Sequence, residues 1–286
     1  MAVGILISIN KPGSADTSSN TVKLCIFVWL DLRIANRNLS LNRYILLEKE
    51  SNVLKTISWF AYLWWSLLKP RFELMKLNRQ GKTLERDACA HSIARKWAQT
   101  GLVLNGSSIQ VNGIENVPKA GGVLFVANHQ SNFDIPIMIG HVPRDKGFIA
   151  KMELAKVPAF SRWMKYVGCI FINRGDPRQS LTAINDAAEQ LKAGHSLVIF
   201  PEGTRSADGT VGPFKAGGLK LAMKARVPIV PVTISGSKNI MPKGSSLIRS
   251  AQVKVIISPP LILDELDGMD SNQISEKVRN IIISNL

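Results

Sequence analysis

The sequence predicts an α/β domain in which one mainly parallel or mixed sheet is covered by helices. From about Leu84 onward, short apolar runs typical of strands alternate with segments of helical periodicity. The chain of 286 residues is long enough to bury a large core, and it contains neither an internal repeat nor a low-complexity tract. Polar and glycine-rich stretches follow several apolar runs, as expected where loops leave the strand ends of such a sheet.

Five short apolar runs are expected to form the strands. They are rich in aliphatic side chains, and polar, glycine or proline residues bound them. Pro228 and Pro231 favour an edge strand or a pocket wall, because proline lacks the N–H that a central ladder position needs. The expected strands are 122–127, 169–172, 197–200, 229–234 and 253–257.

Helical segments are expected between these strands. In 178–193, apolar side chains recur on one helical face from Leu181 to Leu191, and Gly194 follows as a C-terminal cap. The segment 215–225 is a second helix of this kind.

The segment 53–83 is expected to be a helical anchor at a membrane surface. Residues 57–68 carry no charge and include Trp59, Trp64 and Trp65, a residue type that favours the headgroup boundary. As a helix they would be about 18 Å long at ~1.5 Å per residue, shorter than a ~30 Å hydrocarbon core. Lysines and arginines dominate the residues that follow, which favours an anionic surface. The alternative interpretation is an ordinary helix buried in the core.

Residues 1–52 are expected to be a poorly defined N-terminal extension. They show no clear periodicity, and their one apolar stretch, 22–30, is short. The remainder, 84–286, is expected to form the working domain. The run at 57–68 lies too far along the chain for a signal peptide.

Composition narrows the choice of partners. The net charge of +15 favours a polyanionic partner, whether nucleic acid, an anionic lipid surface or a phosphorylated substrate. Zinc-finger spacing, RNP-like aromatic strands and long basic blocks are absent from the sequence, which argues against nucleic acid. The three cysteines at 25, 89 and 169 are widely spaced, as expected in a reducing compartment, and the sequence predicts no metal site.

The first candidate for chemistry follows the expected strand 122–127. Here His129 ends the strand and Asp134 opens a helix, with Pro136 suited to its first turn. If the chain turns between them, the imidazole can act as a base while the carboxylate fixes its tautomer. The alternative is that Asp134 only caps the helix and His129 is an ordinary polar residue.

Three cationic side chains are candidates for binding an anion. Arg205 follows the strand 197–200 within Phe-Pro-Glu-Gly-Thr-Arg-Ser, and Arg174 ends the strand 169–172. An arginine fork suits phosphate oxygens. The alternatives are a tight turn with a surface Arg–Glu pair and, for Lys215, a solvated surface lysine. Cys169 lies in an apolar strand and is interpreted as core, not as a nucleophile.

Four stretches, taken in order, resemble the conserved blocks of the glycerophospholipid acyltransferase family, in particular its bacterial 1-acylglycerol-3-phosphate acyltransferases. The resemblance covers about residues 105–260 and shows no departure within the blocks. The blocks are N-H-x-x-x-x-D at 128–134, G-x-x-F-x-x-R at 168–174, F-P-E-G-T-R-S at 200–206 and V-P-I-V-P-V at 227–232.

The resemblance implies transfer of a fatty acyl group from acyl-CoA or acyl-carrier protein to a glycerol hydroxyl, without a metal or organic cofactor. His129 would be the general base and Asp134 its orienting carboxylate. Arg174 and Arg205 would hold the acceptor's phosphate, with further contributions from Lys151, Lys215, Glu202, Gly203 and Thr204.

The expected acceptor is 1-acyl-glycerol-3-phosphate, at the cytoplasmic face of the cell membrane and on an anionic membrane surface. Glycerol-3-phosphate or another lysophospholipid is the alternative within the family. A catalytically silent lipid-binding protein is the alternative from a different class. The intact His129–Asp134 pair argues against that last alternative.

Overall fold

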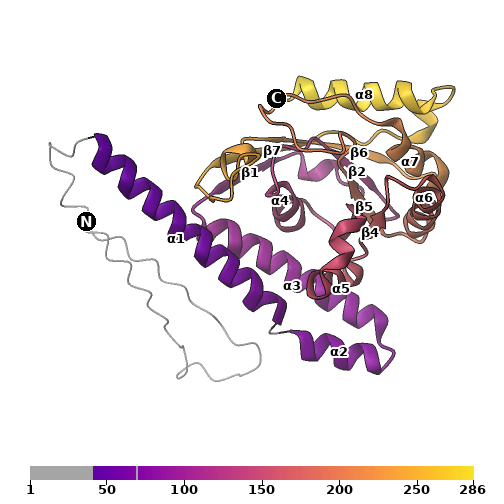
Figure 1. Ribbon diagram of the computed structural model, residues 1–286. Helices are drawn as coiled ribbons and strands as arrows, with labels where there is room; N and C mark the ends of the chain where they lie inside the picture. Colours follow the sequence, from indigo (N-terminus) through magenta and orange to yellow (C-terminus); the bar gives the residue numbers. More distant parts are fainter. Residues whose placement is uncertain (1–40, 69) are drawn as a thin grey trace. The chain divides into compact units, whose positions relative to one another are not determined.

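A computed structural model describes residues 41–68 and 70–286 (Figure 1). The chain divides into the units Met1–Glu50 and Ser51–Leu286. The apolar stretch 22–30 and Cys25 lie outside the described residues. The second unit contains the sheet and the candidate site.

Seven strands form one sheet in the order β1-β7-β6-β2-β5-β3-β4. Strands β6 and β7 pair antiparallel, and the other neighbours pair parallel, so the expected mixed sheet is confirmed. The strands are β1 (Ser108–Asn112), β2 (Leu124–Ala127), β3 (Lys146–Lys151), β4 (Ile170–Ile172), β5 (Ser196–Ile199), β6 (Ile229–Ser235) and β7 (Gln252–Ile257).

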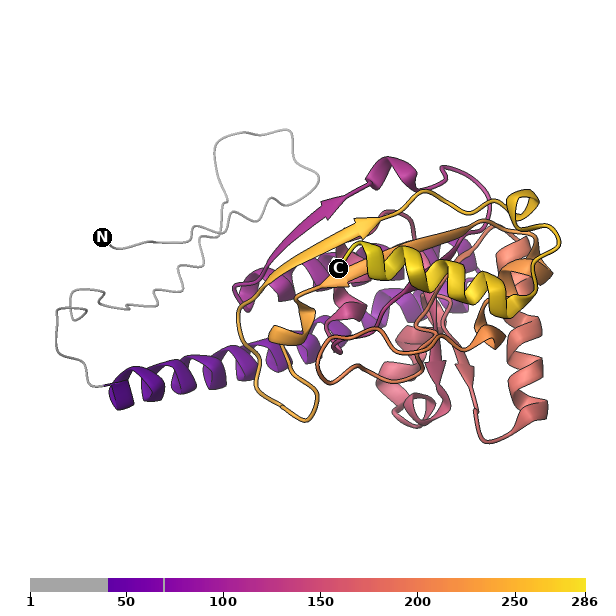
Figure 2. The ribbon, with the colours of Figure 1, turned by 90° about the horizontal axis from the view of Figure 1, so that it is seen from above.

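Helices cover both faces of this sheet (Figures 1 and 2). The α-helices are α1 (Leu41–Leu68), α2 (Arg71–Arg79), α3 (Thr83–Leu104), α4 (Asp134–His141), α5 (Pro158–Tyr166), α6 (Pro177–Lys192), α7 (Lys220–Ala225) and α8 (Ser271–Ser284). Short 3-10 turns occur at η2 (Ile114–Asn116), η3 (Met152–Lys156), η4 (Ala216–Gly218), η5 (Ser237–Asn239) and η6 (Leu263–Leu266).

The core has two parts because side chains alternate across each strand. On β2, Phe125 and Ala127 pack with residues of α3 and α4. Leu124 and Val126 pack on the opposite face with residues of α6, α7 and α8. All four are fully buried, so β2 is a central strand, and the loop that follows it begins inside the domain.

The structure differs from the sequence-based expectation at several elements. The strands β1 and β3 were not expected, and both contain polar side chains. The expected helix 215–225 is α-helical only over α7, since Gly217 and Gly218 lie in the 3-10 turn η4.

The prolines mark no edge: β6 is central and Pro231 pairs with Val126 of β2. The carbonyl of Pro231 accepts from the N–H of Ser258, just beyond the end of β7. The nitrogen of Pro231 points to the same side of the strand as its carbonyl. Because β7 has already ended at this point, the absence of an N–H on Pro231 costs no hydrogen bond of the ladder.

The expected anchor helix is the C-terminal part of α1, and α2 contains much of the basic stretch. None of the helices described combines the length and apolar character needed to cross a bilayer. Trp59 was expected at a membrane surface, but its ring packs against Phe133 and Trp97, with centroids 5.0 and 5.8 Å apart. Trp64 and Trp65 remain 49% and 62% exposed.

Candidate active site

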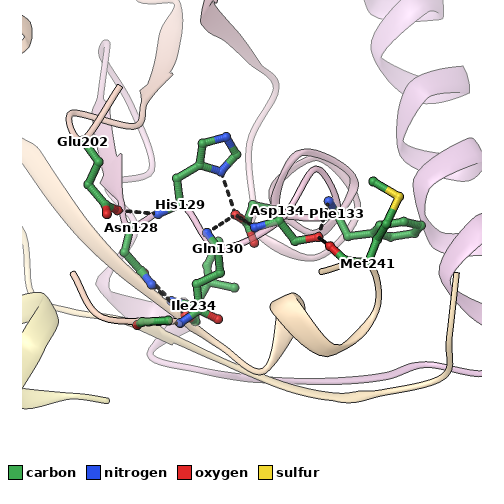
Figure 3. A network of polar contacts seen from close by, with 10 residues as sticks. Asn128, His129, Gln130, Phe133, Asp134, Glu202, Ile234 and Met241 are labelled. Carbon is green, nitrogen blue, oxygen red and sulfur yellow. Dashed lines mark hydrogen bonds and ion pairs between the residues drawn. The ribbon is translucent and has the colours of Figure 1, made fainter. Parts of the chain in front are cut away.

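His129 and Asp134 meet because the chain turns between β2 and α4, as Figure 3 shows. His129 Nδ1 lies 2.7 Å from Asp134 Oδ2. Asp134 is the first residue of α4, but its carboxylate caps no N–H of the helix. It instead accepts from the main-chain N–H groups of Gln130 and Ser131, at 2.7 and 2.8 Å. These bonds hold the carboxylate toward His129, so Asp134 does more than begin a helix.

The pair has the geometry of a base and its orienting group. An ionised carboxylate only accepts hydrogen bonds, so Nδ1 carries the hydrogen and Nε2 keeps its lone pair. The Asp134 side chain is fully buried, whereas that of His129 is 17% exposed. The imidazole also stacks on Phe200, with ring centroids 4.3 Å apart. His129 can therefore present Nε2 to a hydroxyl while Asp134 stabilises the imidazolium.

Glu202 was expected to shape a substrate pocket, and in the structure its carboxylate binds the main chain of the loop between β2 and α4. Its Oε1 accepts from the N–H of His129 at 2.7 Å, and its Oε2 accepts from the N–H of Gly212 at 3.1 Å. The N–H of Ser206 donates to the carbonyl of His129 at 2.8 Å. Burial raises the pKa of Glu202, and its two main-chain hydrogen bonds oppose that rise. The loop 202–212 thus holds His129 from both of its peptide groups.

A cavity of about 620 Å³ lies beside His129. Its walls are mostly apolar and come from α1, α3, α4 and α5 as well as from the ends of β3 and β5, which suits a hydrocarbon chain. Leu63, Leu67, Ile93 and Trp97 of this wall lie outside the motif blocks, so only the fold reveals them. The expected binding residues on the wall are Lys151, Arg174, Gly203, Thr204 and Arg205.

Positive charge dominates the polar part of this cavity. Lys151, Arg174 and Arg205 line it, against the single acidic residue Glu153 among the described lining residues. Such a distribution favours an anionic group such as a phosphate. Lys243 was not among the expected residues, and its Nζ donates to the carbonyl of Arg205 at 2.9 Å.

Lys215 lies on a second, smaller cavity of about 320 Å³. This cavity shares Arg174, Gly203 and Phe200 with the first. Arg174 Nη1 donates to the carbonyl of Gly203 at 2.6 Å. A Cβ added to Gly203, which has φ +74°, would lie 2.7 Å from Arg174 Nη1 and 3.5 Å from Lys215 Nζ. The absence of a side chain at Gly203 therefore allows Arg174 and Lys215 to lie close to the main chain of this turn.

Other reactive groups in the described part of the chain do not form a second centre. Burial raises the pKa of Cys169 to about 12, so the thiol stays protonated, consistent with a core position. Within residues 41–68 and 70–286, no group of three or more His, Cys, Asp or Glu side chains is arranged to hold a metal ion.

Comparison with known proteins connects this geometry to one family. The family model described as "Acyltransferase" matches residues 108–235. A probable 1-acyl-sn-glycerol-3-phosphate acyltransferase of Mycoplasma pneumoniae is 36% identical over 189 residues, 62% of this chain and 70% of that protein. The 1-acyl-sn-glycerol-3-phosphate acyltransferase of Borreliella burgdorferi is 30% identical over 192 residues, 67% of this chain and 77% of that protein.

A plant relative and a solved structure extend the match. The chloroplastic 1-acyl-sn-glycerol-3-phosphate acyltransferase BAT2 of Brassica napus is 33% identical over 198 residues, 68% of this chain but 56% of its own length, so the chain spans little more than half of that relative. The crystal structure of the 1-acyl-sn-glycerophosphate acyltransferase PlsC of Thermotoga maritima is similar with a TM-score of 0.73 and 27% identity, covering 83% of this chain and 95% of that one. The chain belongs to the acyltransferase family that includes the bacterial 1-acyl-sn-glycerol-3-phosphate acyltransferases.

Proposed function

We propose that this protein transfers a fatty acyl group from a thioester to the sn-2 hydroxyl of 1-acyl-glycerol-3-phosphate and so forms phosphatidate. The observation that carries the proposal is the His129–Asp134 pair, held at 2.7 Å, with His129 in the wall of a mostly apolar cavity that also bears three cations. The substrate named for the bacterial relatives supports the same acceptor.

In the proposed mechanism, His129 Nε2 accepts the proton of the acceptor hydroxyl as its oxygen attacks the thioester carbonyl. The tetrahedral intermediate collapses with cleavage of the C–S bond, and the departing thiolate takes the proton back from the imidazolium. Asp134, already bonded to Nδ1, stabilises the imidazolium in between. The oxygen nucleophile comes from the acceptor, so no acyl-enzyme forms.

The cavity wall supports a division of binding between apolar and charged contacts. Arg205, Arg174 and Lys151 bind the acceptor's phosphate, and the aliphatic walls take a fatty acyl chain. The donor is acyl-CoA or acyl-carrier protein. Glycerol-3-phosphate or another lysophospholipid as acceptor would need the same cations, so only a direct comparison of acceptors separates these alternatives.

We place the reaction at the cytoplasmic face of a membrane. Trp64, Leu68 and Phe72 of α1 and α2 are 49%, 54% and 80% exposed, which favours contact with a headgroup boundary. Free Cys89 and Cys169 suit a reducing compartment. Replacing Trp64 and Phe72 by serine should shift the protein from the membrane fraction to the soluble one, and unchanged sedimentation with membranes would contradict this placement.

The experiment that tests the reaction compares lysophosphatidate with glycerol-3-phosphate, each with acyl-CoA and with acyl-carrier protein as donor. His129→Ala should lower turnover by ~10²–10⁴-fold, the typical cost of losing a general base. His195→Ala, at an exposed position at the other end of β5, is the matched control and should retain turnover. A folded His129→Ala protein with near-normal turnover would remove the mechanism and favour a silent lipid-binding protein.

A further inference from the structure

We infer that the segment 151–165, comprising η3 and α5, is a second lipid-contact surface that holds the cavity mouth against an anionic bilayer. This inference rests on the proposed function, because it assigns the route by which a lipid acceptor reaches His129. We call this segment the η3–α5 surface. Its exposed apolar side chains are Leu154 and Val157, and its exposed cations are Lys151, Lys156, Arg162 and Lys165.

The apolar part of the η3–α5 surface is exposed to solvent. Leu154 is 40% exposed and Val157 is 44% exposed, and Pro158, the first residue of α5, is also exposed. Residues 154 and 157 are one turn apart, so the two side chains lie on the same side of the segment. A pair of aliphatic side chains at a protruding turn can enter the interfacial layer of a bilayer.

The charges around this apolar turn favour an anionic partner. The segment contains these four exposed cations and one exposed acidic residue, Glu153. None of them forms an ion pair with an acidic residue in the described part of the chain. Flexible side chains of this kind can keep their charges among lipid headgroups while their stems cover apolar surface.

The same segment connects the wall of the His129 cavity with the protein surface. Leu154 and Phe160 line that cavity together with Leu63 and Leu67 of α1, and Leu154 is also exposed to the outside. Trp163 Nε1 donates to the carbonyl of Leu67 at 3.2 Å, which joins α5 to the end of α1.

The end of α1 and the start of α2 therefore adjoin the η3–α5 surface. A cavity of about 210 Å³ is lined by Leu68 and Arg71 from the former and by Pro158 and Arg162 from the latter, and Leu68 is 54% exposed. Contact at both places sets the cavity mouth at the bilayer surface, so the acyl chain of the acceptor can pass along Leu154 without crossing water. An acidic protein would use the cations but would leave the apolar turn and the adjoining Leu68 without a counterpart.

The test replaces side chains that lie outside the catalytic cavity. Val157→Glu should weaken binding to vesicles of equal parts phosphatidylglycerol and phosphatidylcholine about tenfold, because a charge is added where an apolar side chain enters the interface. Ile283→Glu makes the same change at a 40% exposed position on α8, across the sheet, and should bind like the wild type. Equal binding by both variants would overturn the inference.

A second pair of variants tests the charges. Lys156→Gln/Lys165→Gln should weaken vesicle binding and reduce its dependence on salt, whereas Lys220→Gln/Lys254→Gln removes two exposed cations elsewhere and should not. Acylation of lysophosphatidate in vesicles should fall in parallel with binding. If vesicle binding persists while the KM for acyl-carrier protein rises, the surface binds an acidic protein and the inference is wrong.

A water-dispersed, short-chain lysophosphatidate separates this inference from the proposed function. The full-length Val157→Glu protein should acylate it at the wild-type rate. If the wild type itself fails to acylate this acceptor, the proposed function fails. If the wild type acts on it while Val157→Glu still binds and acylates in vesicles normally, only the lipid-contact inference fails.

Discussion

The hydrogen bonds of Glu202 predict a catalytic defect without a loss of substrate affinity. Hydrogen bonds to a charged group are worth ~1.5–3 kcal/mol each, and the carboxylate makes one to His129 and one to Gly212. In Glu202→Gln the amide has a single acceptor atom, so one of these two N–H groups faces an NH₂ group. Because the side chain is only partly buried, we expect the free energy of unfolding to fall by about 1–2 kcal/mol.

The catalytic effect follows from the position of His129. A displacement of ~1 Å at a reacting group can cost ~10²-fold, so Glu202→Gln should lower kcat by about 10- to 100-fold. The KM values for acceptor and donor should change little, because Glu202 is bonded to main-chain groups of the loop. Glu153→Gln, which removes a carboxylate from the cavity wall without affecting these bonds, is the control. Steady-state kinetics with each substrate varied separately would test this, and a raised acceptor KM with normal kcat would refute the reasoning.

The raised pKa of Glu202 gives the same variant a pH signature. The folded state holds this proton more tightly than the unfolded state, so ionisation costs stability as the pH rises from the ordinary carboxyl value through the raised one. The stability of the wild type relative to Glu202→Gln should therefore decline as the pH rises above the ordinary carboxyl pKa. Denaturant unfolding of both proteins across that pH range would show parallel stabilities if the carboxyl were unperturbed.

Three further predictions concern the base, the anion-binding cations and a buried lysine. Asp134→Asn should lower kcat by ~10²–10⁴-fold, because a neutral amide no longer stabilises the imidazolium and no longer fixes the tautomer of His129; near-normal kcat would contradict the pair. Arg205→Lys, and Arg174→Lys if both bind the phosphate, should raise the acceptor KM by roughly 10- to 150-fold, since one forked hydrogen bond is lost; a raised donor KM instead would reverse the assignment of substrates. Burial, with Arg95 and Arg144 nearby and Asp145 opposing, lowers the pKa of Lys146 to about 7. The unfolded state then holds that proton more tightly, so unfolding measurements should show stability rising above about pH 7 by up to ~1.4 kcal/mol per pH unit, a rise that Lys146→Met should lack.

The sequence predicted the strands whose side chains are buried on both faces. The run at β2 is uniformly apolar because helices cover it on both sides. Strand β1 was missed because it is a half-exposed edge strand with alternating polar side chains. Strand β3 begins and ends with lysine, and the buried Lys146 is accommodated by the carbonyls of Met138 and Val142 at the end of α4, 3.1 and 2.8 Å away. The two lysines interrupt the apolar run by which the other strands were expected, so β3 was missed.

Some residues of the candidate site could be expected from the sequence, and others could not. His129 and Asp134 lie five residues apart, and a strand end followed by a helix start indicated that the two side chains could meet. The role of Glu202 could not be inferred, because its partners are main-chain groups, one of them 73 residues away. Trp59 illustrates the opposite error. The uncharged run around Trp59 predicted contact with a membrane surface. In the structure its ring instead packs against Trp97 of α3 and Phe133 of the β2–α4 turn.

The contacts between α1 and the residues that precede β7 have a consequence for biosynthesis. The end of β7 is translated about 190 residues after the end of α1, which takes roughly 10–40 s at ~5–20 residues per second. Lys55 and Thr56 of α1 bond to Ser250 and Ile248, which precede β7 and emerge equally late. The helix is therefore outside the ribosome well before its partners on the domain exist. If α1 binds a membrane as proposed, that interval gives its apolar side chains time to meet the lipid surface before the domain completes its sheet.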